Sequence, residues 1–303
     1  MVKLQGKPIV ITGASSGIGA ATALACARAG MPVVVGARRK ERLEDLCRTI
    51  ERAGGSARAM ELDVRDAAAC RAMVDLCVRE FGSIYGVYAN AGYGEEVGAI
   101  EMTDAAVRDM FEVNFFGSLN IIRPAVEAMG PVAGEGGRGW RGHVLICSSC
   151  LAQLPIPYYS VYSATKAAQH HLGRAMKLEL EGARIAVTTI HPVGTKTEFF
   201  TTVERRSVAN GKQSKLLSHS PELFMQTPEF VARKTVRALR RPHSELWPGL
   251  MGNFTRFGMS VLTMWPGLGD MVLRGMVKRR VNHWNNGGSG GNGGRGVGGA
   301  GKA

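Results

Sequence analysis

Apolar runs and helix-like segments alternate along the first 240 residues of the chain. Six short runs lack polar alternation, which is typical of strands buried on both faces of a sheet; they lie at 8–12, 32–36, 57–62, 84–89, 143–148 and 185–191. Segments with helical character separate and follow them, at 20–29, 39–53, 67–81, 103–129 (with Pro124 as a kink), 160–182 and 230–241. This alternation predicts an α/β fold with a doubly wound parallel sheet.

A glycine-rich turn follows the first predicted strand. Residues 12–19 read TGASSGIG, and a predicted helix comes directly after them. Glycines let the backbone turn tightly and approach a pyrophosphate, which then sits at the helix N-terminus. The strand–turn–helix context favours a dinucleotide site of the Rossmann type over a plain turn. We expect the cofactor to contact Thr12, Gly13, Ser15, Ser16, Gly17, Ile18 and Gly19.

The spacing T-G-x-x-x-G-x-G resembles that of the short-chain dehydrogenase/reductase family, and the resemblance extends over roughly residues 5–245. Further motifs of that family appear in order: Asp63-Val64, Asn90-Ala91-Gly92, Asn114 within VNFFG, the serine pair at 148–149, and Tyr162-x-x-x-Lys166. Because independent motifs agree in order and spacing, the resemblance is specific. It implies a Rossmann fold and an oxidoreductase that transfers a hydride between a nicotinamide and a carbonyl or secondary alcohol.

Tyr162 and Lys166 are expected to carry the chemistry. They lie four residues apart on one predicted helix and therefore share a face. A free tyrosine titrates near pH ~10, and we expect the nearby ammonium to lower the pKa of Tyr162 so that the phenol can exchange a proton with the substrate oxygen. The resemblance assigns Lys166 a second role, which is to hold the hydroxyls of the nicotinamide ribose.

The resemblance adds two catalytic residues. Ser149 stands 13 residues before Tyr162, and its hydroxyl would orient the substrate oxygen. Asn114 would anchor a water in a proton relay behind the lysine. The alternative for Asn114 is a structural amide at a helix kink.

The end of the second predicted strand favours NADP(H). Residues 36–40 read GARRK, with three basic side chains and no carboxylate. An arginine fork suits a 2′-phosphate, whereas an acidic residue would bind a ribose hydroxyl. Arg38 is the first candidate and Arg39 the second, the alternative being a solvated basic helix start.

Other cofactor contacts are implied by the resemblance. Asp63 and Val64 would contact the adenine, and Asn90 would lie near the neighbouring ribose. The remaining expected contacts are Ala91, Gly92, Pro192, Val193, Thr195 and Thr197. Val193 stands where the family usually has a glycine.

Composition excludes several classes of protein. The 303 residues are 45% hydrophobic, enough for a large core and too many for a disordered chain, a collagen or a small disulfide scaffold. With no signal peptide evident, the six cysteines indicate reduced thiols and a cytoplasmic protein, and Cys147-x-x-Cys150 indicates packing residues. We expect no metal site, because there is no zinc motif, and no nucleic-acid partner.

The C-terminal part combines apolar and basic residues. From Leu246 onward, the sequence contains seven basic residues and a single acidic residue, Asp270. Trp247, Trp265 and Trp284 lie in the same part, with a basic cluster at 278–280. This combination favours peripheral contact with an anionic membrane. The alternatives are a lid over the substrate site, a contact within a homodimer or homotetramer, or a solvated end.

The chain is therefore expected to have three parts. They are an NADP(H)-binding Rossmann catalytic domain at 1–245, a helical extension at 246–284, and a disordered glycine-rich tail at 285–303. Irregular connections are expected at 130–142 and 197–228.

The substrate is expected to be a small-molecule carbonyl or alcohol. The residues expected around it are apolar, which suggests a lipophilic compound such as a steroid, a retinoid or an acyl chain; the alternative is that they only close the core. They include Tyr93, Leu154, Ile156, Tyr158, Phe199, Phe200, Leu223 and Phe224. An alternative function is a cofactor-binding sensor or a membrane-peripheral interaction protein of the same fold, but the retained Tyr162 and Lys166 favour an enzyme.

Overall fold

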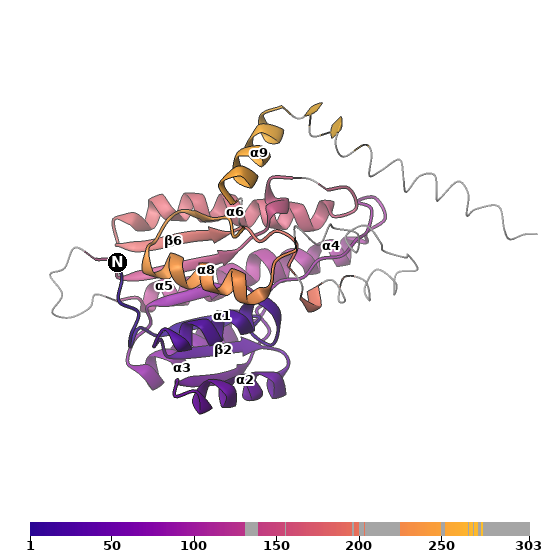
Figure 1. The fold of residues 1–303 in the computed structure, drawn as a ribbon. Helices are drawn as coiled ribbons and strands as arrows, with labels where there is room; N and C mark the ends of the chain where they lie inside the picture. Colours follow the sequence, from indigo (N-terminus) through magenta and orange to yellow (C-terminus); the bar gives the residue numbers. More distant parts are fainter. Residues whose placement is uncertain are drawn as a thin grey trace, which may run out of the picture.

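A parallel sheet of seven strands runs through the centre of the described part of the chain (Figure 1). This computed structural model describes residues 1–130, 139–154, 156–195, 197–199, 203, 225–249, 252–265, 267–268, 270–271 and 274. The strand order is β3-β2-β1-β4-β5-β6-β7, and every neighbouring pair is parallel. The strands are β1 (Ile9–Thr12), β2 (Val33–Ala37), β3 (Ala57–Glu61), β4 (Gly86–Ala89), β5 (Gly142–Cys147), β6 (Ile185–Ile190) and β7 (Glu245–Leu246).

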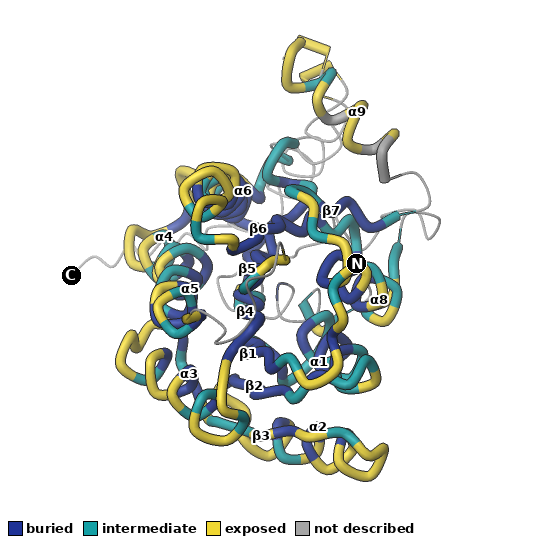
Figure 2. Tube along the Cα trace, turned by 90° about the vertical axis from the view of Figure 1, so that its left-hand side faces the viewer, coloured by how far each residue is buried: buried dark blue, intermediate teal, exposed yellow. Residues whose placement is uncertain are grey.

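Helices cover both faces of this sheet, so the predicted doubly wound α/β fold is confirmed (Figure 2). One face carries α1 (Gly17–Arg28), α2 (Lys40–Arg52) and α8 (Pro228–Arg240). The other carries α3 (Ala67–Phe81), α4 (Asp104–Phe111), α5 (Gly117–Ala128) and α6 (Ser160–Glu181).

The apolar strands have no polar face because each face packs against helices. In β1, Ile9 and Ile11 belong to the core beneath α1, α2 and α8, whereas Val10 belongs to the core beneath α3 and α5. All three residues are fully buried. Burial on both faces is the reason that the strands read as continuous apolar runs in the sequence.

The long helical segment expected at 103–129 is divided by a π-helical turn. This turn, η1, spans Glu112–Phe116 and joins α4 to α5. Pro124 lies inside α5, so the irregularity comes earlier than the expected kink at that proline. Turns of this kind often accompany functional sites, and η1 contains Asn114.

A strand that the sequence pattern does not indicate, β7, extends the sheet beyond β6. It has only two residues, too few for a periodicity, and it spans the expected domain boundary between 245 and 246. Trp247 follows it, is buried, and stacks on the ring of His191 with centroids 4.4 Å apart. The expectation that Trp247 meets a membrane is therefore wrong, because this indole belongs to the core.

The helix α9 (Gly252–Met264) projects from the body of the protein (Figures 1 and 2). Arg256 forms an ion pair with Glu245 at 3.3 Å, and the Thr263 hydroxyl donates to the Gln153 carbonyl at 3.4 Å. Among the described residues, no helix has both the length and the apolar character that a membrane span requires. Trp284, the basic cluster at 278–280 and the glycine-rich tail lie outside the described residues.

Buried histidines make the stability of this fold sensitive to acid. Burial lowers the pKa of His143, on β5, to about 3, and that of His191 to about 4. In the unfolded chain both would titrate near pH ~6.5. Below that pH the unfolded state binds protons that the folded state does not, so the free energy of unfolding falls as the pH falls.

We predict a loss of about 1.4 kcal/mol per pH unit for each of these histidines as the pH falls from 6.5 towards 4. Urea denaturation at pH 7, 6 and 5 measures the slope. In His143→Gln the slope of unfolding free energy against pH should be smaller by about 1.4 kcal/mol per pH unit, because only one of the two histidines remains. A slope that this substitution leaves unchanged would contradict the assignment.

Candidate active site

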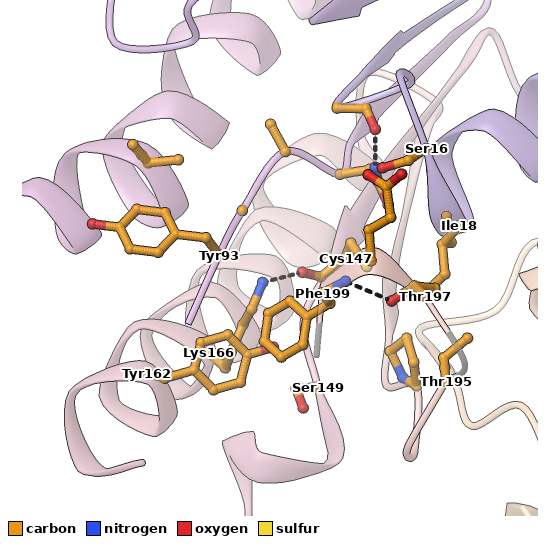
Figure 3. A pocket seen from close by; sticks show the side chains of 18 of the residues that line it. Ser16, Ile18, Tyr93, Cys147, Ser149, Tyr162, Lys166, Thr195, Thr197 and Phe199 are labelled. Atoms are coloured by element: carbon orange, nitrogen blue, oxygen red, sulfur yellow. Dashed lines mark hydrogen bonds between the residues drawn. The ribbon is translucent and has the colours of Figure 1, made fainter. Parts of the chain in front are cut away.

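A cavity of about 660 Å³ opens where the carboxyl ends of the strands meet (Figure 3). Its walls come from the turn between β1 and α1, from the ends of β2 to β6, and from α6. Because β1 pairs with both β2 and β4, the connections on its two sides diverge at this edge. Open α/β sheets bind their ligands at such a switch point.

The glycine turn forms one wall of the cavity. Gly13 and Gly17 have φ of +66° and +58°, which a residue with a side chain rarely adopts. Ser16 is the N-cap of α1, but its side chain makes no capping hydrogen bond, and the first turn of α1 has no acidic residue. The first N–H groups of the helix and its dipole therefore suit a bound anion. The predicted residues of this turn that line the cavity are Gly13, Ser15, Ser16, Gly17 and Ile18.

Thr12 and Gly19 lie behind the cavity wall. The Thr12 hydroxyl accepts hydrogen bonds from the backbone N–H groups of Asn90 and Ala91, both at 3.1 Å. The Asn90 amide donates in turn to the Thr12 carbonyl at 3.0 Å. A Cβ on Gly19 would come within 2.5 Å of the Gly13 carbonyl. Thr12 and Gly19 thus hold the turn in place, while Asn90, Ala91 and Gly92 line the cavity.

The two arginines after β2 both line the cavity, but they differ in their partners. Arg39 donates to the hydroxyls of Ser15 and Ser16 at 2.9 Å and forms an ion pair with Glu198 at 2.8 Å. Arg38 is exposed and makes no hydrogen bond or ion pair with any residue that the structure describes. Of the two guanidinium groups, that of Arg38 is therefore the one available to a further anion.

Glu198 was not expected from the sequence. It pairs with Arg42 as well as with Arg39, and these two guanidinium groups lower the pKa of its carboxyl to about 2. It follows Thr197 on the connection after β6, 156 residues beyond Arg42 in the chain. Only the fold brings these charges together.

Asp63 and Val64, for which the family resemblance implies contact with the adenine, line the same end of the cavity. Asp63 accepts a hydrogen bond from Arg65 at 2.6 Å, which holds the pKa of its carboxyl below the usual value. Arg65 also pairs with Asp109, whose carboxylate accepts from the Tyr93 hydroxyl. Arg65 and Asp109 were not expected from the sequence.

Tyr162, Lys166 and Ser149 lie together on the opposite side of the cavity (Figure 3). All three are buried, Tyr162 and Lys166 on α6 and Ser149 just after β5. The Lys166 ammonium lies 5.6 Å from the centre of the Tyr162 ring. Ser148, the neighbour of Ser149, instead donates to the Lys166 carbonyl and faces the helix. Both serines line the cavity, but it is the Ser149 hydroxyl that interacts with the Tyr162 phenol.

Burial determines the protonation states of this pair. It raises the pKa of Tyr162 above the usual value of a phenol, although interaction with the Ser149 hydroxyl lowers it in part. It also lowers the pKa of Lys166 to about 8. The expected lowering of the tyrosine pKa is therefore wrong in this structure, because removal of the phenolate from water is the largest effect on it and raises the pKa. At neutral pH the Tyr162 phenol therefore keeps its proton.

Asn114 lies one layer behind the cavity and is fully buried. Its side chain accepts from the Tyr93 N–H at 3.0 Å and donates to the Tyr93 carbonyl and the Thr165 hydroxyl. These bonds tie the connection after β4 to α6. The side chain thus has the structural role that the sequence left as an alternative, while its backbone carbonyl faces α6.

The connection after β6 closes the cavity. The cavity is lined there by four residues that the sequence predicted as cofactor contacts, Pro192, Val193, Thr195 and Thr197. The Phe199 ring lies against the Tyr162 ring, with centroids 5.4 Å apart. Of the residues expected around the substrate, four line the cavity, namely Tyr93, Leu154, Ile156 and Phe199. Three others, Phe200, Leu223 and Phe224, lie outside the described residues.

Among the residues described, no group of three or more histidines, cysteines and acidic residues could hold a metal.

Comparisons with known proteins identify the family of the chain. The family model of short chain dehydrogenases matches residues 7–207. An uncharacterized oxidoreductase of Listeria monocytogenes is 30% identical over 244 residues, which cover 79% of this chain and 92% of the relative.

Solved structures give the same result. A short chain dehydrogenase of Mycobacterium paratuberculosis bound to NAD is 25% identical, with a TM-score of 0.67 over 81% of this chain and 97% of that one. An alcohol dehydrogenase of Thermococcus sibiricus complexed with 5-hydroxy-NADP is 27% identical, with a TM-score of 0.65 over 79% and 94%. The chain therefore belongs to the short-chain dehydrogenase/reductase family of oxidoreductases, which use a nicotinamide cofactor.

Proposed function

We propose that this protein is an NADP(H)-dependent oxidoreductase that interconverts a carbonyl group and a secondary alcohol. One observation carries the proposal: a single cavity brings the buried Tyr162, Ser149 and Lys166 together with a phosphate-binding turn. The turn fits a dinucleotide because Gly13 and Gly17 keep the wall free of side chains and the α1 N-terminus offers N–H groups.

The chain's own residues have distinct roles in this reaction. The nicotinamide, when bound, supplies or accepts the hydride. In reduction, Tyr162 donates its proton to the carbonyl oxygen, and Ser149 orients that oxygen by a hydrogen bond. Lys166 stabilises the phenolate that Tyr162 becomes. Two of its N–H groups are held by the Cys147 carbonyl and by Gln169, which leaves the third for the cofactor ribose.

The preference for NADP(H) rests on residues of this chain, because solved relatives are described with NAD and with a derivative of NADP. Arg38 lines the cavity and makes no hydrogen bond or ion pair among the described residues, although its charge acts on Asp63, whereas Arg39 already pairs with Glu198. A 2′-phosphate would give Arg38 a charge-assisted hydrogen bond.

We predict that Tyr162→Phe lowers the rate of NADPH-dependent carbonyl reduction by about 10²- to 10⁴-fold, because it removes the proton donor. NADPH binding, measured by nicotinamide fluorescence, should change little. Tyr85→Phe is a matched control, since Tyr85 is also a buried tyrosine but lies near Lys7, away from the cavity. Rates like those of the unaltered protein in Tyr162→Phe would refute the assignment.

We predict that Arg38→Ala weakens NADPH binding by roughly 10- to 100-fold, from the loss of a charge-assisted hydrogen bond of about 1.5–3 kcal/mol. NADH binding should stay nearly constant. Titration calorimetry with both cofactors measures the difference, and Arg52→Ala, an exposed arginine on α2, controls for net charge. Equal weakening of both cofactors would show that Arg38 does not contact the 2′-phosphate.

The exposed face of α9 favours a second role, at a membrane surface. Phe254, Phe257 and Met264 are each at least 70% exposed, and their spacing places them along one side of the helix. The extension from Leu246 carries seven basic residues and one acidic residue, which suits an anionic surface. We propose that α9 binds anionic lipid.

The position of α9 connects this role to the substrate. Thr263 on α9 donates to the carbonyl of Gln153, which lies between the cavity residues Leu151 and Leu154. A bilayer against α9 would therefore lie near the apolar rim of the cavity. This supports a lipophilic carbonyl or alcohol as the substrate.

We predict that the full-length protein sediments with vesicles that contain phosphatidylserine at low salt and that the double variant Phe254→Ser, Phe257→Ser stays in the supernatant. Neutral phosphatidylcholine vesicles should bind less protein. Protein that stays in the supernatant with both vesicles would exclude the membrane role. A change in oligomeric state between the unaltered protein and the variant would then point to a homodimer or homotetramer contact at α9.

A further inference from the structure

Gln169 connects the ammonium of Lys166 to the backbone of Asn114. Its side-chain oxygen accepts a hydrogen bond from the Lys166 Nζ at 2.9 Å. Its side-chain nitrogen donates to the Asn114 carbonyl at 2.6 Å and to the Ser118 hydroxyl at 2.8 Å. Gln169 is only 1% exposed, so these contacts lie in the protein interior.

The surroundings allow one orientation of this amide. Both hydrogens of its nitrogen are used, and its oxygen faces a cation. A flipped amide would turn a donor towards the ammonium and set its oxygen against the Asn114 carbonyl. Gln169 is therefore held in a single geometry and can in turn hold Lys166.

The Asn114 carbonyl is accessible to this amide because of the local helix geometry. Asn114 lies in the π-helical turn η1, where the regular α-helical pattern of hydrogen bonds is interrupted. The Asn114 carbonyl accepts hydrogen bonds from two side chains, the Ser118 hydroxyl at 2.8 Å and the Gln169 amide at 2.6 Å. A backbone group of η1 thus becomes a fixed support for a side chain of α6.

We propose that Gln169 is a positioning residue for Lys166 and that its carboxamide takes the place of the relay water that the family resemblance implies next to Asn114. The proposal rests on the proposed function, because that function assigns Lys166 its role beside Tyr162. A carboxamide neither gains nor loses a proton near neutral pH. The connection from Lys166 to Asn114 therefore holds the ammonium without conducting a proton, and the proton used by Tyr162 is exchanged on the cavity side.

The electrostatics of Lys166 agree with a supporting acceptor. The titratable groups that face it are the Tyr162 phenol on α6 and the Cys147 thiol on β5, while η1 and α5 contribute the neutral Asn114 and Ser118. Burial lowers the pKa of Lys166 to about 8. An amide oxygen that accepts from the ammonium favours its charged form and opposes this effect.

Two substitutions separate hydrogen bonding from packing. Gln169→Met keeps the volume of the side chain but removes the acceptor for Lys166 and the donor for Asn114. Gln169→Ala removes volume and leaves a site lined by the Lys166 ammonium, the Asn114 carbonyl and the Ser118 hydroxyl. A polar site with three partners can hold a water, which would restore the support that the family resemblance implies.

The expected readout is the pH at which Lys166 loses its proton. In Gln169→Met it should fall by roughly one to two pH units, since hydrogen bonds to charged groups are of that strength. In Gln169→Ala most of the shift should be recovered. Gln169→Glu should shift it upwards, because a carboxylate favours the ammonium more strongly, and this variant tests the proposal even if Gln169→Met does not fold.

Two measurements report this pH. One is the basic limb of the pH profile of kcat for NADPH-dependent carbonyl reduction. The other is NMR titration of ¹⁵N-labelled lysine side chains, with the Lys166 signal assigned through Lys166→Met, and it requires no turnover. If no carbonyl compound is reduced by the unaltered protein, the proposed function fails while the NMR titration still decides the role of Gln169.

Ser163→Ala is the control, because Ser163 is buried on the same helix and its hydroxyl has no partner among the described residues. It should leave both measurements unchanged. A packing role predicts that Gln169→Met behaves like the unaltered protein and that Gln169→Ala is the worst variant. That order, or an unshifted Lys166 titration in both Gln169→Met and Gln169→Glu, would overturn the proposal.

Discussion

The buried ammonium of Lys166 is the charge on which the architecture of the site depends. A cation in the protein interior is stable only where hydrogen-bond acceptors replace water. Here the Cys147 carbonyl at the end of β5 and the Gln169 amide on α6 provide them, at 2.7 and 2.9 Å. The parallel sheet is what makes this possible, because it ends β5 directly beneath the helix that carries Tyr162 and Lys166. The π-helical turn completes the arrangement by exposing the Asn114 carbonyl to Gln169.

The opposite end of the cavity carries positive charge, which suits a bound anion. The α1 N-terminus and the two arginines after β2 form this end. Arg39 shares the Glu198 carboxylate with Arg42, whereas Arg38 is the group proposed to bind a 2′-phosphate. Glu198 is followed by Phe199, whose ring packs on Tyr162. Adjacent residues of the connection after β6 therefore touch both ends of the cavity.

Exposed apolar side chains gather along one side of α9 in the C-terminal part of the chain. The buried Trp247 and the strand β7 attach this part to the sheet, whereas Phe254 and Phe257 on α9 remain exposed. Exposed aromatic residues along one side of a helix are costly in water unless a partner covers them. The proposed lipid contact accounts for this surface and for its position beside the cavity rim.

Much of the fold and of the site could be predicted from the sequence alone, because those features depend on residues that are close together in the chain. Strands buried on both faces are largely apolar, so the five central strands were visible as apolar runs; β3, at the edge of the sheet, was also predicted although Arg58 and Glu61 on it are exposed. The glycine turn and the Tyr162–Lys166 pair depend on short spacings within a single turn or helix. The spacing of Ser149 from Tyr162 and the basic residues after β2 are likewise features of short segments.

Only the tertiary structure decided the contacts between segments that lie far apart in the chain. The pairing of Glu198 with Arg39 and Arg42, and the bridge from Lys166 through Gln169 to Asn114, leave no local pattern. Strand β7 has two residues and shows no periodicity, so only its pairing with β6 reveals it. The pKa of Tyr162 was predicted in the wrong direction for a related reason. The spacing of Tyr162 and Lys166 showed that the ammonium is near, whereas the extent of burial, which is the largest effect on the tyrosine pKa, is set by every element packed around the ring.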